Sequence, residues 1–64
     1  MTNELKLLTI GLTADLTGST ARIASLTIDC LQHDEIPRRD RAELVQRFDA
    51  ALFALAHLRK ALDL

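Results

Sequence analysis

The sequence predicts an all-α fold, a helical hairpin that self-associates into a helical-bundle oligomer. Leucine and alanine dominate a chain with two phenylalanines and no tyrosine or tryptophan, a composition that favours helix over sheet. Apolar residues recur at helical spacing on both sides of a polar segment around Pro37. The 64 residues form a single domain, 1–64, and a chain of this size buries only about 60% of its unfolded surface. Its hydrophobic core is therefore expected to give only marginal stability unless a second chain covers more apolar surface.

The first predicted helix starts near Thr2 or Asn3, either of which can cap it. Its apolar stripe has a three-four-four spacing and consists of Leu5, Leu8, Leu12 and Leu16. Gly18 and the two hydroxyl residues after it interrupt the pattern, which resumes roughly in phase at Ile23, Leu26 and Cys30. The return in phase favours a kink or a short turn over a long loop. We therefore expect a first helix that is kinked or broken near Gly18.

The second predicted helix begins at Pro37, or at Asp40 if Asp40 and Glu43 form a capping box. Its apolar stripe has the alternating four-three spacing of a heptad seam and consists of Leu44, Phe48, Ala51, Leu55, Leu58 and Leu62. A second apolar edge lies beside it, at Val45, Leu52 and Phe53. One antiparallel partner helix cannot cover both edges, so we expect a homo-oligomer, from a dimer to a hexamer.

Few side chains form a pattern that suggests catalysis or metal binding. Cys30 and His33 are three residues apart and His57 is the only further candidate, whereas a metal site needs three or four ligands and a second shell. No nucleophile, base and orienting group occur together. We therefore expect neither an enzyme nor a metal or other cofactor.

Charge and hydropathy patterning limit the compartment and the partners. The formal net charge is −1, so bulk attraction to a membrane surface or to long nucleic acid is not expected. The chain has no signal-peptide pattern and no apolar run near the ~20 residues of a membrane span. A lone cysteine suits a reducing compartment. A cytoplasmic protein is expected.

The segment from Ile36 to Arg41 marks the corner between the helices and carries Arg38, Arg39 and Arg41. Acidic side chains are usual at a helix start, because the helix dipole is positive there. Arginines beside free N–H groups are instead suited to hold an anion such as phosphate. The alternative is a solvated network of ion pairs with the nearby carboxylates, which are Asp34, Glu35, Asp40 and Glu43.

A motif in the second helix adds a more specific expectation. It consists of Arg39-Asp40-Arg41, then Gln46-Arg47-Phe48-Asp49, then Ala51-Leu52-Phe53, with Pro37 just upstream. This pattern resembles that of a family of small phage anti-CBASS proteins. The resemblance implies a helical hairpin in oligomers up to hexamers, in the cytoplasm of an infected bacterial host. It also implies a sponge, which sequesters cyclic oligonucleotide second messengers between protomers without cleaving them.

The arginine cluster and the resemblance together suggest a ligand site. A cyclic di- or trinucleotide carries two or three phosphates, which suit bidentate guanidinium contacts. In this hypothesis Arg39 and Arg41 hold phosphate, with Arg38 in the same cluster. Gln46 offers its amide to a base or ribose, and Arg22 closes the pocket from a neighbouring protomer.

Two other functions fit the same sequence. The first is a homo-oligomeric helical interaction module that binds a protein partner through an exposed apolar patch. The second is a hairpin dimer that binds structured RNA through the basic residues between Arg38 and Arg47, with strong salt dependence.

Overall fold

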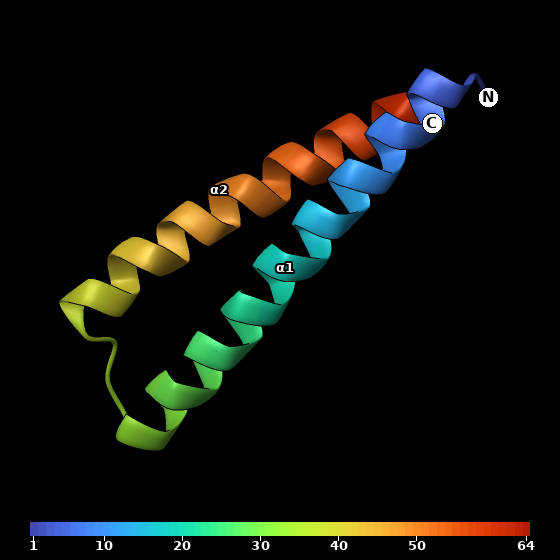
Figure 1. Ribbon diagram of the computed structural model, residues 1–64. Helices are drawn as coiled ribbons and strands as arrows, with labels where there is room; N and C mark the ends of the chain where they lie inside the picture. Colours follow the sequence, from blue (N-terminus) through green and yellow to red (C-terminus); the bar gives the residue numbers. More distant parts are fainter.

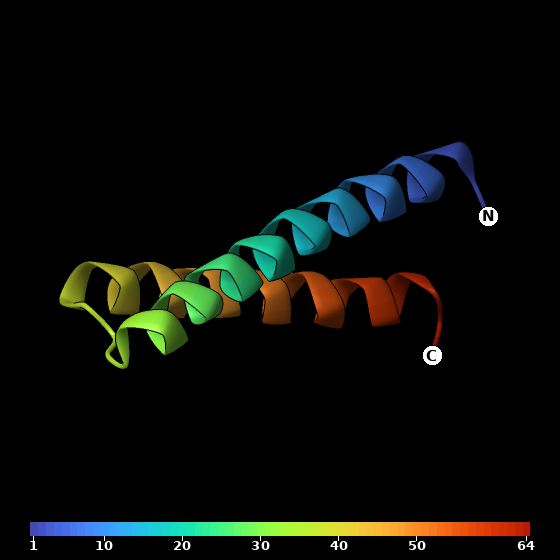
Figure 2. The same cartoon turned by 90° about the horizontal axis from the view of Figure 1, so that it is seen from below.

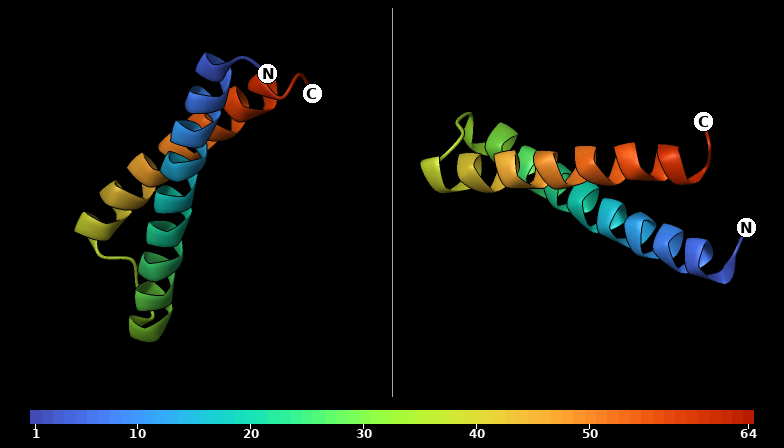
Figure 3. Two further views of the ribbon diagram at one scale, coloured as in Figure 1. Left: turned by 45° about the vertical axis from the view of Figure 1, so that its right-hand side comes forward. Right: turned by 90° about the horizontal axis from the view of Figure 1, so that it is seen from above.

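The computed structural model describes residues 1–64 and consists of two helices, α1 (Asn3–His33) and α2 (Arg38–Ala61). They run antiparallel, so both chain termini lie at one end of the hairpin (Figure 1). The molecule is a rod of 47 × 17 × 13 Å. The helices cross at an angle: they lie apart at the termini in Figure 2 and apart at the corner in the left view of Figure 3. The predicted all-helical hairpin is confirmed.

Helix α1 is continuous from end to end. The hydroxyl of Thr2, one of the two predicted caps, accepts the Leu5 N–H at 3.1 Å, and Asn3 is the first helical residue. The helix ends where Asp34 adopts a left-handed conformation with φ 55° and donates its N–H to the Cys30 carbonyl. The expected alternative of a break at Gly18 is wrong. One interior glycine costs only about 1 kcal/mol relative to alanine, and side chains on both sides of it pack against α2. A kink stays a prediction.

Helix α2 begins at Arg38, one residue after the predicted start at Pro37. Pro37 occupies the N-cap position and no side chain accepts a hydrogen bond there. The alternative start at Asp40, with a capping box from Glu43, is wrong. The Glu43 carboxylate is engaged by Arg22 of α1 and does not return to the Asp40 N–H.

The two helices pack through one heptad seam each. The residues with the least exposure alternate at four-three spacing and are Leu5, Thr9, Leu12, Leu16, Ser19, Ile23, Leu26 and Cys30 on α1, and Asp40, Leu44, Arg47, Ala51, Ala54, Leu58 and Ala61 on α2. Of these, only Leu12, Ser19, Leu26, Ala51 and Ala54 are buried, and the others are partly exposed. The core is a single layer of side chains between two helices.

The predicted stripe of α2 mixes two neighbouring seams. Its members Leu44, Ala51 and Leu58 face α1. The other three members, Phe48, Leu55 and Leu62, are about half exposed, so α1 covers only half of the predicted stripe. A four-three alternation fits two registers one residue apart, and the structure places Ala54 rather than Leu55 inward. Small side chains there let α1 approach closely. On α1, Leu8 is likewise exposed and Thr9 replaces it in the seam.

Candidate functional site

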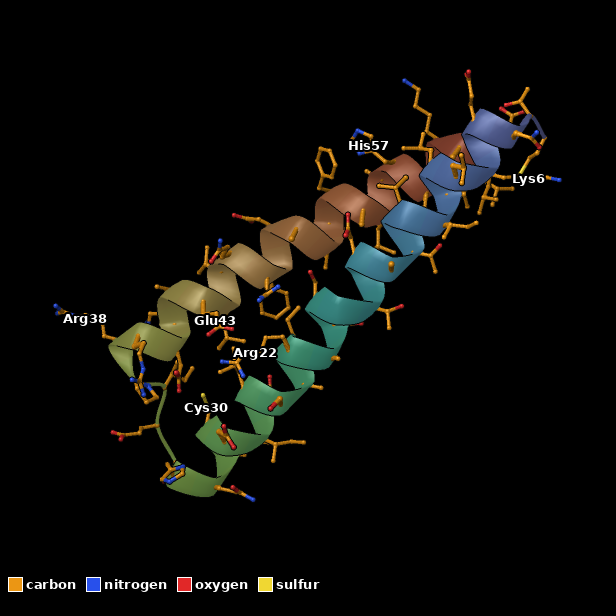
Figure 4. All side chains as sticks on the ribbon, viewed as in Figure 1. Lys6, Arg22, Cys30, Arg38, Glu43 and His57 are labelled. Carbon is orange, nitrogen blue, oxygen red and sulfur yellow. The ribbon has the colours of Figure 1, made fainter.

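The start of α2 brings three arginines to one end of the hairpin but not to one face. An α-helix turns 100° per residue, so side chains two apart lie on opposite sides. Arg39 and Arg41 therefore occupy opposite flanks of α2. Arg38 extends away from α1 (Figure 4). On each flank of α2, a single protomer can therefore contact a phosphate with only one of these two guanidinium groups.

Each flank continues with different chemistry. Gln46 follows Arg39 two turns later on the same side of the helix, which fits their predicted joint role. The flank of Arg41 continues instead with Val45 and Phe48, both of which are exposed. A site that uses Arg39 and Arg41 together must therefore draw them from different protomers.

Arg22 and Glu43 form the ion pair that closes the corner between the helices. The guanidinium donates two hydrogen bonds, from Nε to Oε2 and from Nη2 to Oε1, the latter at 2.9 Å. The two side chains point towards one another across the helix interface (Figure 4). Arg47 adds a third contact, with its Nε 3.8 Å from Glu43 Oε2. Sequence reasoning missed Glu43 as a partner of Arg22, because 21 residues separate them.

This pairing shifts the pKa of both groups in the direction that favours their charged forms. The hydrogen bond from Arg22, reinforced by its charge, lowers the pKa of the Glu43 carboxyl. The same contact raises the pKa of Arg22. Arg22 therefore stays charged and held by Glu43, and its predicted role of closing a ligand pocket requires this pair to open.

The expected network of ion pairs around the arginines is formed only in part. Arg39 Nε lies 3.9 Å from Asp40 Oδ1 and its side chain is 93% exposed. Glu43 pairs with Arg22 and Arg47 rather than with Arg39. Arg38 and Arg41 make no ion pair. Three guanidinium groups at the corner are thus free, or nearly free, to meet a ligand.

The groove at the corner itself is a poor anion site. It is lined by Asp29, His33, Glu35, Pro37, Arg39 and Asp40. Three carboxylates face one guanidinium there, and His33 Nδ1 lies 2.8 Å from the Asp29 carbonyl oxygen. A phosphate inside the groove would meet repulsion from these carboxylates. An anion is therefore better held outside this groove, within reach of Arg38 and of the exposed side chain of Arg39.

A second hollow lies midway along the hairpin and was not foreseen. It is lined by Ala14, Asp15, Gly18, Ser19, Arg47, Ala50, Phe53 and Ala54. Its floor is made of small residues from both helices, with a guanidinium and an aromatic ring among its lining groups. The Phe53 ring stacks on His57, with centroids 3.9 Å apart. The small residues that form this hollow are visible in the sequence of both helices. Predicting that they lie opposite one another requires the antiparallel register of the two helices.

Metal-ligating side chains do not gather anywhere in the hairpin: no group of three or more His, Cys, Asp or Glu is placed to hold an ion. Cys30 is a free, half-buried thiol in the seam. Neither helix combines the length and the apolar character that crossing a membrane requires. No known protein family, curated protein or solved structure matches this chain.

Proposed function

We propose that this chain is a homo-oligomeric sponge that binds and sequesters a cyclic di- or trinucleotide at the arginine corner without cleaving it. The observation that carries this proposal is the set of guanidinium groups at the start of α2 that lack a firm carboxylate partner. Uncapped N–H groups of the first turn lie beside them. The resemblance to phage anti-CBASS proteins supplies the ligand class.

The roles of the site residues follow from their flanks. Arg39 and Gln46 of one protomer bind a phosphate and the adjacent base or ribose. Arg41 approaches the ligand from another protomer, because it lies on the opposite flank of its own helix. Arg38 extends outward and adds positive charge to the flank of Arg39 or to the flank of Arg41. Arg22 positions α2 through Glu43 instead of touching the ligand.

The test is native mass spectrometry of the purified protein with a panel of cyclic di- and trinucleotides. We expect mass additions in a fixed ratio to protomers. Replacing Arg39 and Arg41 by alanine should weaken binding by roughly 10- to 100-fold for each lost charge-assisted contact, with the oligomer intact. The matched control is Arg59→Ala with Lys60→Ala, which removes the same charge from the other end of α2. Retained affinity in the first double variant would contradict the proposed site.

The exposed apolar surface favours a second candidate function, a homo-oligomeric helical module that binds a protein partner. Fourteen large hydrophobic residues are exposed in the single hairpin. Monomeric soluble proteins rarely expose so much apolar surface unless it binds a partner. A stable oligomer that takes up no cyclic nucleotide but binds a helical protein would favour this candidate.

A further inference from the structure

The outward side of α1 carries a heptad seam of exposed residues, of which only Ala14 and Leu31 also line hollows shared with other parts of the chain. Its members alternate at three-four spacing over 25 residues, include no charged side chain, and are Leu7, Ile10, Ala14, Thr17, Ala21, Ala24, Ile28 and Leu31. All of them are exposed, and Leu7, Ile10, Ile28 and Leu31 are each more than half exposed. A continuous seam of this kind is the pattern by which one helix packs against another.

The seam reads nearly the same in both directions. Counted from its two ends, leucine matches leucine, isoleucine matches isoleucine, alanine matches alanine, and Thr17 matches Ala21. Such a palindrome is self-complementary about a two-fold axis at the level of Ser19. Two copies of α1 placed antiparallel would put large residues beside large ones at the ends and small beside small at the centre. That is the requirement for an isologous interface.

Two glycines beside this seam are not required by any close contact within the hairpin, although Gly18 also lines the hollow midway along it. Gly11 and Gly18 lie in the interior of α1, where glycine is disfavoured. A Cβ added at either position meets no atom within 4 Å. In the antiparallel pair, Gly18 would face Gly18 of the second copy across the two-fold axis. The absence of side chains lets the two backbones approach closely there.

The threonines on this side of α1 do not oppose burial. The hydroxyl of Thr13 donates to the Thr9 carbonyl at 2.8 Å, and that of Thr17 to the Thr13 carbonyl at 2.8 Å. Thr20 donates to the Leu16 carbonyl at 2.8 Å. Because each hydroxyl already has a partner in its own helix, covering these side chains leaves no donor unsatisfied.

Charge selects the antiparallel orientation. The register that pairs Leu7 with Leu31 brings Lys6 beside Asp34 of the second copy, at both ends of the contact. Lys6 extends away from α2 (Figure 4) and makes no ion pair within its own chain. It is therefore free to pair in this way.

The outer seam of α2 is less suited to pairing with itself. The register that sets Val45 against Leu55 also sets Arg41 against Arg59 of a second copy. Like charges at such flanking positions disfavour association. The self-complementary face of this molecule is therefore on α1.

The hairpin exposes more surface than a compact monomer of its mass, and the excess is about the area that one partner would cover. Its accessible surface is 5159 Å², whereas a compact monomer of 7.1 kDa exposes about 4,100 Å². The excess is about 1,000 Å², and a protein–protein interface of standard size buries about 800 Å² on each partner.

We propose that two copies of this chain associate through the outer seam of α1, antiparallel about a two-fold axis near Ser19, to form a four-helix dimer. This interface is independent of any nucleotide, so failure of the proposed sponge function would leave it standing.

The test compares two identical substitutions on the outer faces of the two helices. Ala21→Arg places a charge at the centre of the proposed interface, and Ala56→Arg places it on the exposed side of α2. By analytical ultracentrifugation without nucleotide, we expect the wild type and Ala56→Arg to associate in even multiples of 7.1 kDa. The mass of the Ala21→Arg assembly should be half that of the wild-type assembly or less. A monomeric wild type, or an unchanged mass in Ala21→Arg, would overturn the proposal, as would equal loss in both variants.

Thiol cross-linking keeps the proposal testable if Ala21→Arg does not fold. Thr13→Cys and Thr27→Cys are made separately in a Cys30→Ser background, and the two proteins are mixed. The antiparallel register sets position 13 beside position 27 of the second copy. A short bis-maleimide should therefore join unlike chains in clear excess over like ones. Cross-links only between like chains, or none, would overturn the proposal.

Discussion

At the scale of single residues, Glu43 is the side chain that ties the two helices together at the corner. It accepts two hydrogen bonds from Arg22 and lies near Arg47. Glu43 therefore makes no ion pair with the arginines that precede it in α2, and only Arg39 has a carboxylate, that of Asp40, within 4 Å. One residue thus stabilises the hairpin and leaves its neighbours available to a ligand.

The lowered pKa of Glu43 makes this contribution dependent on pH. The folded-state pKa lies below the ordinary value of 4.5, so the stabilisation is fully present above the unfolded-state pKa. It is lost as the pH falls through the folded-state pKa. We expect the melting temperature of the wild type to decrease between about pH 5 and pH 3. Glu43→Gln should melt lower at pH 7 and show a smaller decrease.

Circular dichroism melts at several pH values measure this effect. Glu35→Gln is the matched control, because Glu35 makes no ion pair and its removal should leave the wild-type profile unchanged. An identical pH profile in Glu43→Gln and the wild type would show that the pair does not stabilise the fold.

At the scale of elements, α1 contains two glycines that lower its helix propensity although no contact within the hairpin requires them. Its two glycines weaken a helix of 31 residues without accommodating any intrachain contact. Its capped start and left-handed end at Asp34 are, by contrast, well formed. The glycines are therefore the feature of α1 that the proposed packing of a second α1 helix would explain.

Gly18→Ala should have opposite effects on folding and on association. The added methyl group meets open space in the hairpin, so the single chain should gain about 1 kcal/mol from helix propensity. The same methyl group should keep two α1 helices apart. We expect the melting temperature to rise at low protein concentration and to depend less on concentration than in the wild type.

The reverse substitution on α2 serves as the control. Ala56→Gly lies on an exposed side and should lower the melting temperature equally at all concentrations. A Gly18→Ala variant with undiminished concentration dependence would show that no helix packs against Gly18.

At the scale of the whole molecule, a two-helix rod has too little interior to be stable by a wide margin. Five buried residues make up its core, and a chain of 64 residues has at most about 3–10 kcal/mol of folding free energy. Each buried side chain therefore carries a large share of the stability.

Leu26, only 2% exposed, is the side chain on which this margin depends most. Leu26→Ala should cost about 2–5 kcal/mol, enough to unfold much of the population at low concentration, as measured by urea denaturation. Leu64→Ala removes the same atoms from a residue that is 81% exposed and should be nearly neutral. Similar midpoints for the two variants would contradict the packing described above.

The sequence alone determined the helical class and the corner near Pro37, and it narrowed the first cap to Thr2 or Asn3, because capping, proline geometry and helical periodicity act over a few residues. It did not determine whether Ala54 or Leu55 faces inward, nor that Arg22 meets Glu43. Both depend on aligning two helices whose contacting residues are far apart in the chain. Several apolar seams fit the same periodicity, and only packing in three dimensions chose between them.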